Sequence, residues 1–491
     1  MIWNFLAWSF VAIPLLIAAG IICAVTGLKR KHSTRTPFVA IAGMATALLF
    51  VLLSVQDIWG GNITSFQMNA WPAPFGITIV VDAFTILLSV MITGIGLAAA
   101  VFSYRYIKER RPEYYGLLCI LMAGLLGIVH TGDMFNLFVF FEISNIASYA
   151  LVGYYRKAKS AEAGIKYLIV GSVASSMILL GIALLYASVG TLNMAGLSVA
   201  LAQSTSVIVP ISLALLISGF AFKCGLVPFH FWMPDAYQGA PSPVAAVLAA
   251  LSANAGIYSI LRVGVSVFSS PQVLLTTLAV FGIASMVTGA VLAIMQSDLK
   301  RMLAYSGVSQ IGYILMAVGL GTTLGMTGGV FHIINHTIIK SLLFLSAGVI
   351  IYHAGTSNMY EVGKKVRFSP AFTYIFLVGV LALAGIPFLN GFASKWIIYI
   401  STFEITPLLT VFTIIISVLT FAYGIKAFYL MFLSGSDSAA RTKTPWSMMA
   451  PLVVLALLCI MIGIIPQIGT GVSEAISAGL DPVVYAEAVL G

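Results

Sequence analysis

Apolar stretches of about twenty residues follow one another along most of this 491-residue chain. A helix of that length crosses the hydrocarbon core of a bilayer. Hydrophobic residues make up 60% of the chain and charged residues 8%, whereas a soluble domain carries about 25% charged residues. Because a soluble fold cannot cover so much apolar surface, the sequence predicts an all-α, polytopic membrane protein of about fourteen transmembrane helices. The predicted spans lie near 5–28, 37–55, 77–104, 115–131, 134–155, 163–188, 207–232, 241–262, 272–296, 301–323, 326–354, 371–403, 407–434 and 446–468.

Basic residues are concentrated in alternate loops. They lie at 29–35, 105–111, 156–159, 300–301, 364–367 and 441–443, while 56–76, 189–206, 263–271 and 321–325 hold none. By the positive-inside rule, we expect the basic loops on the cytoplasmic side of the cell membrane and both termini on the outer side. The net charge of +9 is then a consequence of topology, and the sequence gives no reason to expect a nucleic-acid partner.

Four ionisable residues lie deep in apolar spans: Glu142, Lys223, Lys340 and Lys395. On insertion scales, a charge at the bilayer centre costs about 2.5–3.5 kcal/mol, so it persists where it is paired, hydrated or functional. These residues predict ion or proton movement through the protein.

Two of the predicted spans are interrupted beside a lysine. Gly225 and Pro228 follow Lys223, and Gly385 and Pro387 precede Lys395. Proline removes a backbone donor and breaks a helix. Two broken spans, the seventh and the twelfth, indicate two inverted five-helix repeats, an arrangement that places ion sites near the midplane of many transporters. The predicted organisation is N-terminal helices over 1–114, repeats over 115–262 and 263–434, and a last helix with a short tail over 435–491.

Glu142 is a natural partner for Lys223. A carboxylate stabilises a buried ammonium, and opening the pair favours proton release from the lysine. The pair is therefore interpreted as a switch; a static ion pair that joins two helices is the alternative.

His332, His336 and Lys340 recur every four residues and so share one helix face. Histidine relays protons near neutral pH, although an HxxxH pair also occurs in zinc sites and histidines join helices by hydrogen bonds. His230 and Asp235 flank the first break, where they either admit protons or cap helix ends. Other basic residues have simpler interpretations: Arg262 snorkels from a span end, and Lys426 is structural or functional.

Binding motifs for cofactors do not occur in the sequence. The four cysteines, Cys23, Cys119, Cys224 and Cys459, are far apart in apolar runs, as expected of small buried side chains. We see no metal cluster, P-loop or dinucleotide motif. The sequence therefore predicts no cofactor, no metal and no redox or hydrolytic site of its own.

Several segments resemble a known family over roughly residues 80–430. They are GDMFNLFVFFE, KCGLVPFHFWMPDAYQGAPSPV, DLKRMLAYSGVSQIGY, HIINHTIIKSLLFL and GIPFLNGFASKW, and they resemble the antiporter-like subunits of respiratory complex I and of Mrp-type cation/proton antiporters. The FNLFVFFE stretch looks most like the D-type subunit of Mrp antiporters and its counterparts in membrane-bound hydrogenases. The resemblance implies fourteen helices, two inverted repeats over helices four to eight and nine to thirteen, and a central axis of buried charges. It implies that Glu142, Lys223 and Lys395 are key charges of that axis, with His332 and His336 beside them.

The chain departs from the family pattern at one position. Where the family usually has a lysine on helix eight, this chain has Asn254, four residues before Tyr258. Asparagine forms hydrogen bonds but cannot carry a proton as a cation. Passage across the centre then requires water, or Lys340 and the histidines; a modified ion preference and a degenerate pathway are the alternatives.

Three functions follow from these features. The first is an H⁺- and/or Na⁺-translocating subunit of a multisubunit membrane complex, either the D-type subunit of a Mrp antiporter or the equivalent subunit of a membrane-bound hydrogenase or complex I-like oxidoreductase. The second is a redox subunit binding quinone or metal, for which no motif exists. The third is a scaffold with vestigial charges, an interpretation that Asn254 strengthens.

Overall fold

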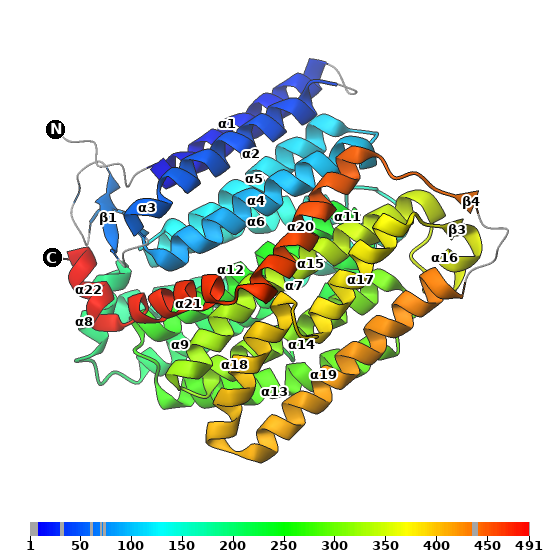
Figure 1. Cartoon of the computed structure of the whole chain (residues 1–491). Helices are drawn as coiled ribbons and strands as arrows, with labels where there is room; N and C mark the ends of the chain where they lie inside the picture. The colour runs from blue at the N-terminus through cyan, green and yellow to red at the C-terminus, as the bar shows by residue number, and fades with distance from the viewer. Residues whose placement is uncertain are drawn as a thin grey trace.

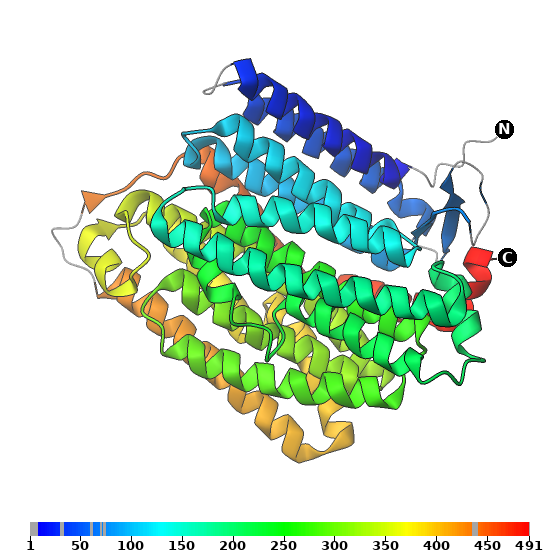
Figure 2. The same ribbon diagram turned by 180° about the vertical axis from the view of Figure 1, so that it is seen from behind.

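The computed structural model describes residues 8–29, 34–58, 62–68, 71, 75–434 and 440–490, and these residues are mostly helical (Figures 1 and 2). The first predicted span begins at residues 5–7 and the first basic loop includes Arg30 and Lys31; these residues lie outside the described ones. The N-terminal elements are α1 (Trp8–Lys29), α2 (Thr36–Leu53), α3 (Val55–Ile58), β1 (Thr64–Gln67), β2 (Thr78–Val81), α4 (Ala83–Tyr106) and α5 (Arg111–His130).

The central elements run from residue 134 to residue 294. They are α6 (Met134–Val152), α7 (Ala158–Val189), α8 (Met194–Leu201), α9 (Ile208–Cys224), α10 (Met233–Gly239), α11 (Ser242–Val247), η3 (Leu248–Ser252), α12 (Ala253–Leu261), η4 (Arg262–Val267) and α13 (Gln272–Ile294). The four elements from α11 to η4 form one continuous helix with two π-helical turns.

The remaining elements complete the chain. They are α14 (Leu299–Gly319), α15 (Thr323–Ala354), α16 (Met359–Lys365), β3 (Val366–Arg367), α17 (Pro370–Ala384), α18 (Asn390–Ile405), α19 (Pro407–Phe428), η5 (Tyr429–Leu433), β4 (Ala440–Arg441), α20 (Trp446–Ile464), α21 (Gln467–Gly479) and α22 (Pro482–Leu490). The strands of the described residues form two small sheets, an antiparallel pair of β1 with β2 and a parallel pair of β3 with β4.

Among the described residues, twelve helices are long and apolar enough to cross a membrane, so the chain is a multi-pass membrane protein. Two shorter apolar helices, α9 and α17, are the first halves of the interrupted segments. Whether these bring the number of spans to the predicted fourteen stays a prediction. Helix α15 lies in the interior, packed against α14, α17, α18 and α20, so its polar side chains are held away from lipid.

Both predicted breaks are present. Helix α9 ends at Cys224 and α17 ends at Ala384, and the next residues, Gly225 and Gly385, have φ of +75° and +84°. This left-handed conformation favours glycine. Beyond each break a second helix, α10 or α18, follows after a short irregular segment. Irregular backbone at membrane depth is tolerated where protein or a cavity surrounds it.

Two stretches of the chain have the same local structure, and their equivalent residues are separated by a constant number of residues in the sequence. Asp133 caps α6 and forms an isolated antiparallel β-bridge with Asn193. In the same way, Asp298 caps α14 and forms an isolated antiparallel β-bridge with Asn358. The same spacing relates α7 to α15, two helices of 32 residues each. In each stretch, two backbone hydrogen bonds of 2.8–2.9 Å lie beside this bridge, and they occupy corresponding positions in the two stretches. This correspondence supports a duplicated unit; the boundaries of the repeats stay a prediction.

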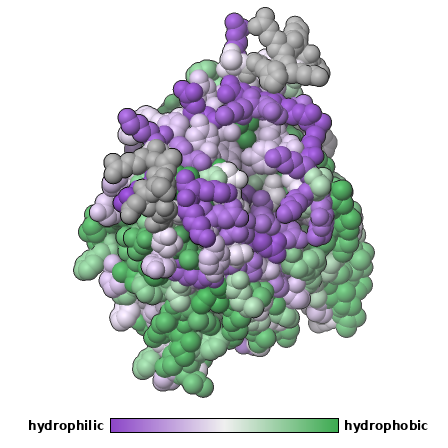
Figure 3. Space-filling view, turned by 90° about the vertical axis from the view of Figure 1, so that its right-hand side faces the viewer, coloured by the Kyte–Doolittle hydropathy of each residue, from purple (hydrophilic) through white to green (hydrophobic). Residues whose placement is uncertain are grey.

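The two ends of the molecule differ in character. Both chain termini, β1 and α22 lie at one end, and β3, β4 and α16 lie at the other (Figure 1). Seen from the latter end, hydrophilic residues cover the centre of the face and hydrophobic residues surround much of it (Figure 3). This face includes exposed basic residues of the predicted basic loops, such as Lys364 and Arg367. Which end faces the cytoplasm stays a prediction.

Candidate functional site

Glu142 lies on α6, half-buried, and faces α7. Its Oε1 accepts a short hydrogen bond from the Ser175 hydroxyl and a bond of 3.2 Å from Asn145 Nδ2. Asn145 follows Glu142 by three residues and therefore shares its helix face. A carboxylate with two donors at this depth satisfies part of its hydrogen-bonding capacity without a cation.

Lys223 occupies the last turn of α9, directly before the first break, and is 2% exposed. Its Nζ lies 2.5 Å from Asn145 Oδ1 and 3.4 Å from the Ser144 hydroxyl. No ion pair within 4.0 Å joins Lys223 to Glu142 among the ion pairs of the described residues. The direct pair that the sequence predicted is thus replaced by a bridge through the Asn145 amide.

Asn254 lies on α12 with 1% of its surface exposed. Its Nδ2 donates to Ala250 O at 2.7 Å and to Thr337 Oγ1 of α15 at 2.6 Å. Its Oδ1 is buried and has no hydrogen-bond partner among the atoms of the described chain. A buried, unsatisfied oxygen costs free energy, so this position retains capacity for one more donor, such as water.

The two predicted histidines of α15 are buried, but their surroundings differ. His332 bonds Ser394 Oγ through Nδ1 at 2.8 Å and Gln310 Oε1 through Nε2 at 3.0 Å. Both ring nitrogens of His336 lack a partner among the described residues.

Lys340 and Lys395 are bound by neutral oxygens. Lys340 Nζ donates to Leu303 O at 2.9 Å and to Ser306 Oγ at 2.5 Å. Lys395 Nζ donates to Leu383 O at 3.0 Å and to Ala384 O at 3.3 Å, and it lies 5.1 Å from the centre of the Tyr313 ring. The break at Gly385 frees these last carbonyls of α17 from helical bonding, which is why they can receive the ammonium.

His230 and Asp235 are not brought into this group. Asp235 forms ion pairs with Arg301 at 2.5 Å and with Lys166 at 3.1 Å, and so links α10 to α14 and α7. It does not cap α10, whose N-cap is Trp232. His230 Nδ1 is buried without a partner in the described part of the chain, and proton access through His230 stays a prediction.

For two other basic residues, the structure overturns one interpretation from the sequence, that of Arg262, and favours one of the two alternatives left open for Lys426. Arg262 does not snorkel: it is 2% exposed, it forms a short ion pair with Asp82, and its guanidinium lies 4.9 Å from the Tyr485 ring. Aspartate and aromatic partners inside the protein replace water here, so the head group stays buried. Lys426 donates to Ile294 O at 2.7 Å and to Gln296 O at 3.1 Å, which favours the structural interpretation.

Asn145, Ser175 and Gln310 are polar partners that the sequence analysis did not single out. Asn145 had a signal, because it lies one helical turn from Glu142. Ser175 and Gln310 contact the site across helices and had none. No group of three or more metal-binding side chains occurs among the residues that the structure describes.

Comparisons with known proteins agree on one family. A family model described as "NADH:quinone oxidoreductase/Mrp antiporter, TM" matches residues 131–420. The D-type subunit of the Na(+)/H(+) antiporter of Alkalihalophilus pseudofirmus is 32% identical over 98% of this chain and 99% of that protein.

Two solved structures are similar along their whole length. A chain of the membrane-bound sulfane sulfur reductase, an archaeal respiratory membrane complex, is 28% identical with a TM-score of 0.91 and covers 98% of this chain and 99% of its own. A chain of the Mrp complex from Dietzia sp. is 26% identical with a TM-score of 0.90 and covers 100% of both chains.

Proposed function

The chain belongs to the family of membrane subunits described as "NADH:quinone oxidoreductase/Mrp antiporter", and from this premise we propose that it moves H⁺ and/or Na⁺ as the D-type subunit of a Mrp antiporter in the cell membrane. Its partners in this proposal are other integral membrane subunits, the lipid bilayer and the transported ions. The similarity along the full length of the D-type subunit of a Na(+)/H(+) antiporter supports this assignment.

One observation carries the proposal: a series of buried polar side chains extends from one half of the molecule to the other. It begins with the half-buried Glu142 and the buried Asn145 and Lys223, continues with Asn254 and Thr337, and ends with the polar residues of α15 and Lys395. Buried ionisable groups in a membrane interior are costly to retain unless they are used.

The chemistry that we assign to the first half depends on the Asn145 amide. The amide cannot itself be protonated as a cation, so Lys223 and Glu142 exchange a proton when Lys223 leaves Asn145 and meets Glu142 directly or through water. The bridged state then holds the two charges apart, and the direct contact is the transfer state.

The second half would carry the proton onward. Lys340, held by Leu303 O and Ser306, lies on the face that also presents His336, and Lys395 lies next to Ser394, the partner of His332. Asn254 and Thr337 would hold water between the halves.

A second candidate is the equivalent subunit of a redox-driven complex. The similarity to the membrane-bound sulfane sulfur reductase favours it. In that case the same side chains would translocate ions, and the driving reaction would occur in other subunits.

The test is ion flux by the purified complex in sealed vesicles. A Mrp-type antiporter acidifies or alkalinises the lumen when a Na⁺ gradient is imposed, with no electron donor present. A redox-driven pump requires the donor. Flux that is the same in a complex carrying Glu142→Gln would show that transport does not require the Glu142 carboxylate.

A further inference from the structure

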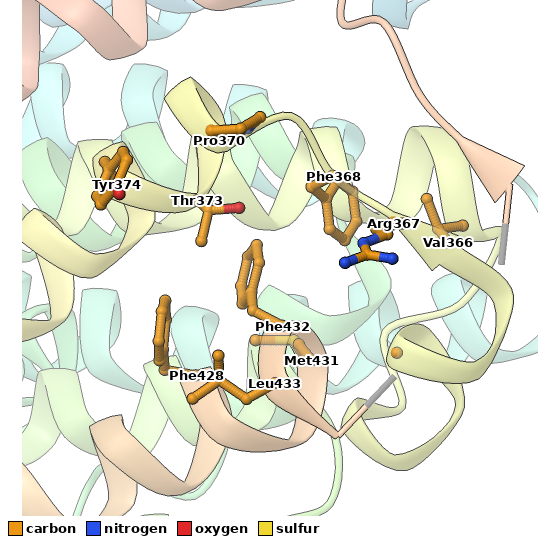
Figure 4. Close-up of a pocket in the computed structure, with 11 residues that line it drawn as sticks. Val366, Arg367, Phe368, Pro370, Thr373, Tyr374, Phe428, Met431, Phe432 and Leu433 are labelled. Carbon is orange, nitrogen blue, oxygen red and sulfur yellow. The ribbon is translucent and has the colours of Figure 1, made fainter. Parts of the chain in front are cut away.

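A cavity of about 430 Å³ opens where α16, β3, α17 and η5 meet (Figure 4). Its walls include Arg367, Phe368, Thr373, Tyr374 and Phe432. Pockets that hold small ligands measure about 300–1,000 Å³. The cavity is separate from the buried polar series, since none of its described lining residues belongs to that series.

Phenyl rings form the apolar wall of the cavity. The Phe432 ring lies 5.3 Å from Phe368, 5.2 Å from Phe428 and 5.1 Å from Phe376, measured between ring centres. Such offset and tilted contacts hold aromatic rings in place. In Figure 4, Phe432 and Phe368 border the same space, beside the side chain of Thr373. A rigid aromatic wall suits an aliphatic chain.

Positive charge borders the other side. Arg367 lines the cavity and is exposed, and Figure 4 shows its guanidinium beside Phe368. Lys364 and Lys365 are exposed on the adjoining α16. Glu361 pairs with Lys365 at 2.8 Å, and this contact lowers the pKa of the Glu361 carboxyl.

The cavity lies beside the ends of two apolar helical segments, where a membrane boundary is expected. Helix α17 begins at Pro370 and the span of α19 and η5 ends at Leu433, and both residues line the cavity. Tyr374, which is 67% exposed, belongs to the residue type that concentrates at the membrane–water boundary. An occupant here would meet water, basic side chains and the acyl region at once.

We propose that this cavity binds one anionic phospholipid, with its phosphate at Arg367 and an acyl chain along Phe432 and Phe368. Arginine binds phosphate through paired hydrogen bonds, and basic residues at a membrane surface attract anionic lipid. The inference does not depend on the proposed transport function. The lipid would bind at the end of the chain formed by α16, β3 and β4, whichever ion the complex moves.

Native mass spectrometry of the purified complex in detergent tests this inference. Phosphatidylglycerol and phosphatidylcholine are added separately at equal concentration, and inorganic phosphate is added as a competitor. We expect one retained phosphatidylglycerol that Arg367→Gln weakens by about tenfold, the effect of losing one charge-assisted contact. Thr373→Trp, which fills the cavity, should also displace it. Arg105→Gln, an exposed arginine outside the cavity, should leave it bound.

Three results would overturn the proposal. Equal retention of phosphatidylcholine would show that charge does not select the occupant. Displacement by inorganic phosphate at similar concentration would assign the site to a free anion. Unchanged lipid retention in both Arg367→Gln and Thr373→Trp would place the lipid elsewhere, including at a subunit interface.

Discussion

The polar site between α6 and α7 of the first repeated stretch holds a carboxylate, whereas the corresponding site between α14 and α15 of the second holds an ammonium. Glu142 of α6 is bonded to Ser175 of α7; at the constant spacing that relates the two stretches, their counterparts are Gly307 of α14 and Lys340 of α15. A Cβ atom built on Gly307 would lie 3.8 Å from Lys340 Nζ. The two polar sites therefore occupy the same place in the duplicated unit, with opposite charge.

The lysines of the two halves also differ in whether a carboxylate is connected to them. Lys223 is connected to a carboxylate through Asn145. Within the described parts of the chain, Lys340 and Lys395 have no carboxylate within 4.0 Å and are held by neutral oxygens. A neutral oxygen offsets the cost of burying a charge less than a carboxylate does. Under the proposed transport function, we therefore expect one half to retain a proton and the other half to pass it on.

The largest expected effect removes the carboxylate of this comparison. Glu142→Gln keeps the shape and the acceptor oxygen but loses the charge, so we expect ion flux to fall by at least about a hundredfold, the range for loss of a proton-transfer group. Assembly should be retained, because Ser175 and Asn145 can still bond an amide. The measurement is Na⁺-driven proton flux in vesicles, with the exposed Glu404→Gln as a matched control. Near wild-type flux would remove the carboxylate from the mechanism.

The second expected effect concerns the lysine at the far end. Lys395→Ala should reduce flux nearly as much as Glu142→Gln, because the carbonyls of Leu383 and Ala384 would lose their ammonium. Lys395→Arg should not restore flux, since arginine does not release its proton. Flux and the amount of assembled complex are measured together. Full flux with arginine would mean that only a fixed positive charge is needed there.

Asn145 provides the next, smaller effect. Asn145→Leu removes the bridge while keeping similar volume, and we expect flux to fall about tenfold, because a buried hydrogen bond to a charge contributes about 1.5–3 kcal/mol. Ser144→Ala removes the 3.4 Å contact of Lys223 and the 2.8 Å hydrogen bond from the Ser144 hydroxyl to Phe141 O, but it keeps the Asn145 bridge. It is the matched control, with flux close to wild type. The pH dependence of flux is measured for both variants. A profile that is unchanged in Asn145→Leu would show that Glu142 and Lys223 do not communicate through this amide.

The sequence predicted the fold better than the contacts. The apolar runs and the glycines at 225 and 385 act locally, so the helical multi-pass fold and the two breaks were confirmed, whereas the number of spans stays a prediction. Contacts between distant helices were not predictable: the burial of Arg262 depends on Asp82 and Tyr485, which come from opposite ends of the chain. The Asn145 bridge was missed because Glu142 was paired directly with Lys223 on the basis of their opposite charges, and the polar residue between them was not considered.

A substitution at Gly307 tests the comparison by adding the carboxylate that the second site lacks. Gly307→Asp would place a carboxylate near Lys340 and replace its neutral partners, so we expect the ammonium to be held and flux to fall about tenfold. Gly307→Ala is the control for size, because its Cβ would be in ordinary contact with Lys340. Flux of both variants is compared at equal assembly. Equal losses in both would attribute the effect to packing, and the charge comparison would fail.

The smallest expected effect is at the centre, where Asn254 separates the two halves. Asn254→Lys replaces an amide that bonds Ala250 O and Thr337 with a group that can carry a proton. We expect flux to change only a few-fold, but its pH optimum to shift, because a titrating group now lies between Lys223 and the residues of α15. Asn254→Gln, which keeps the amide, is the control and should retain the wild-type optimum. Flux against pH in the reconstituted complex decides the matter. If rate and optimum are both unchanged in Asn254→Lys, position 254 lies off the conduction path, and the two halves must communicate elsewhere.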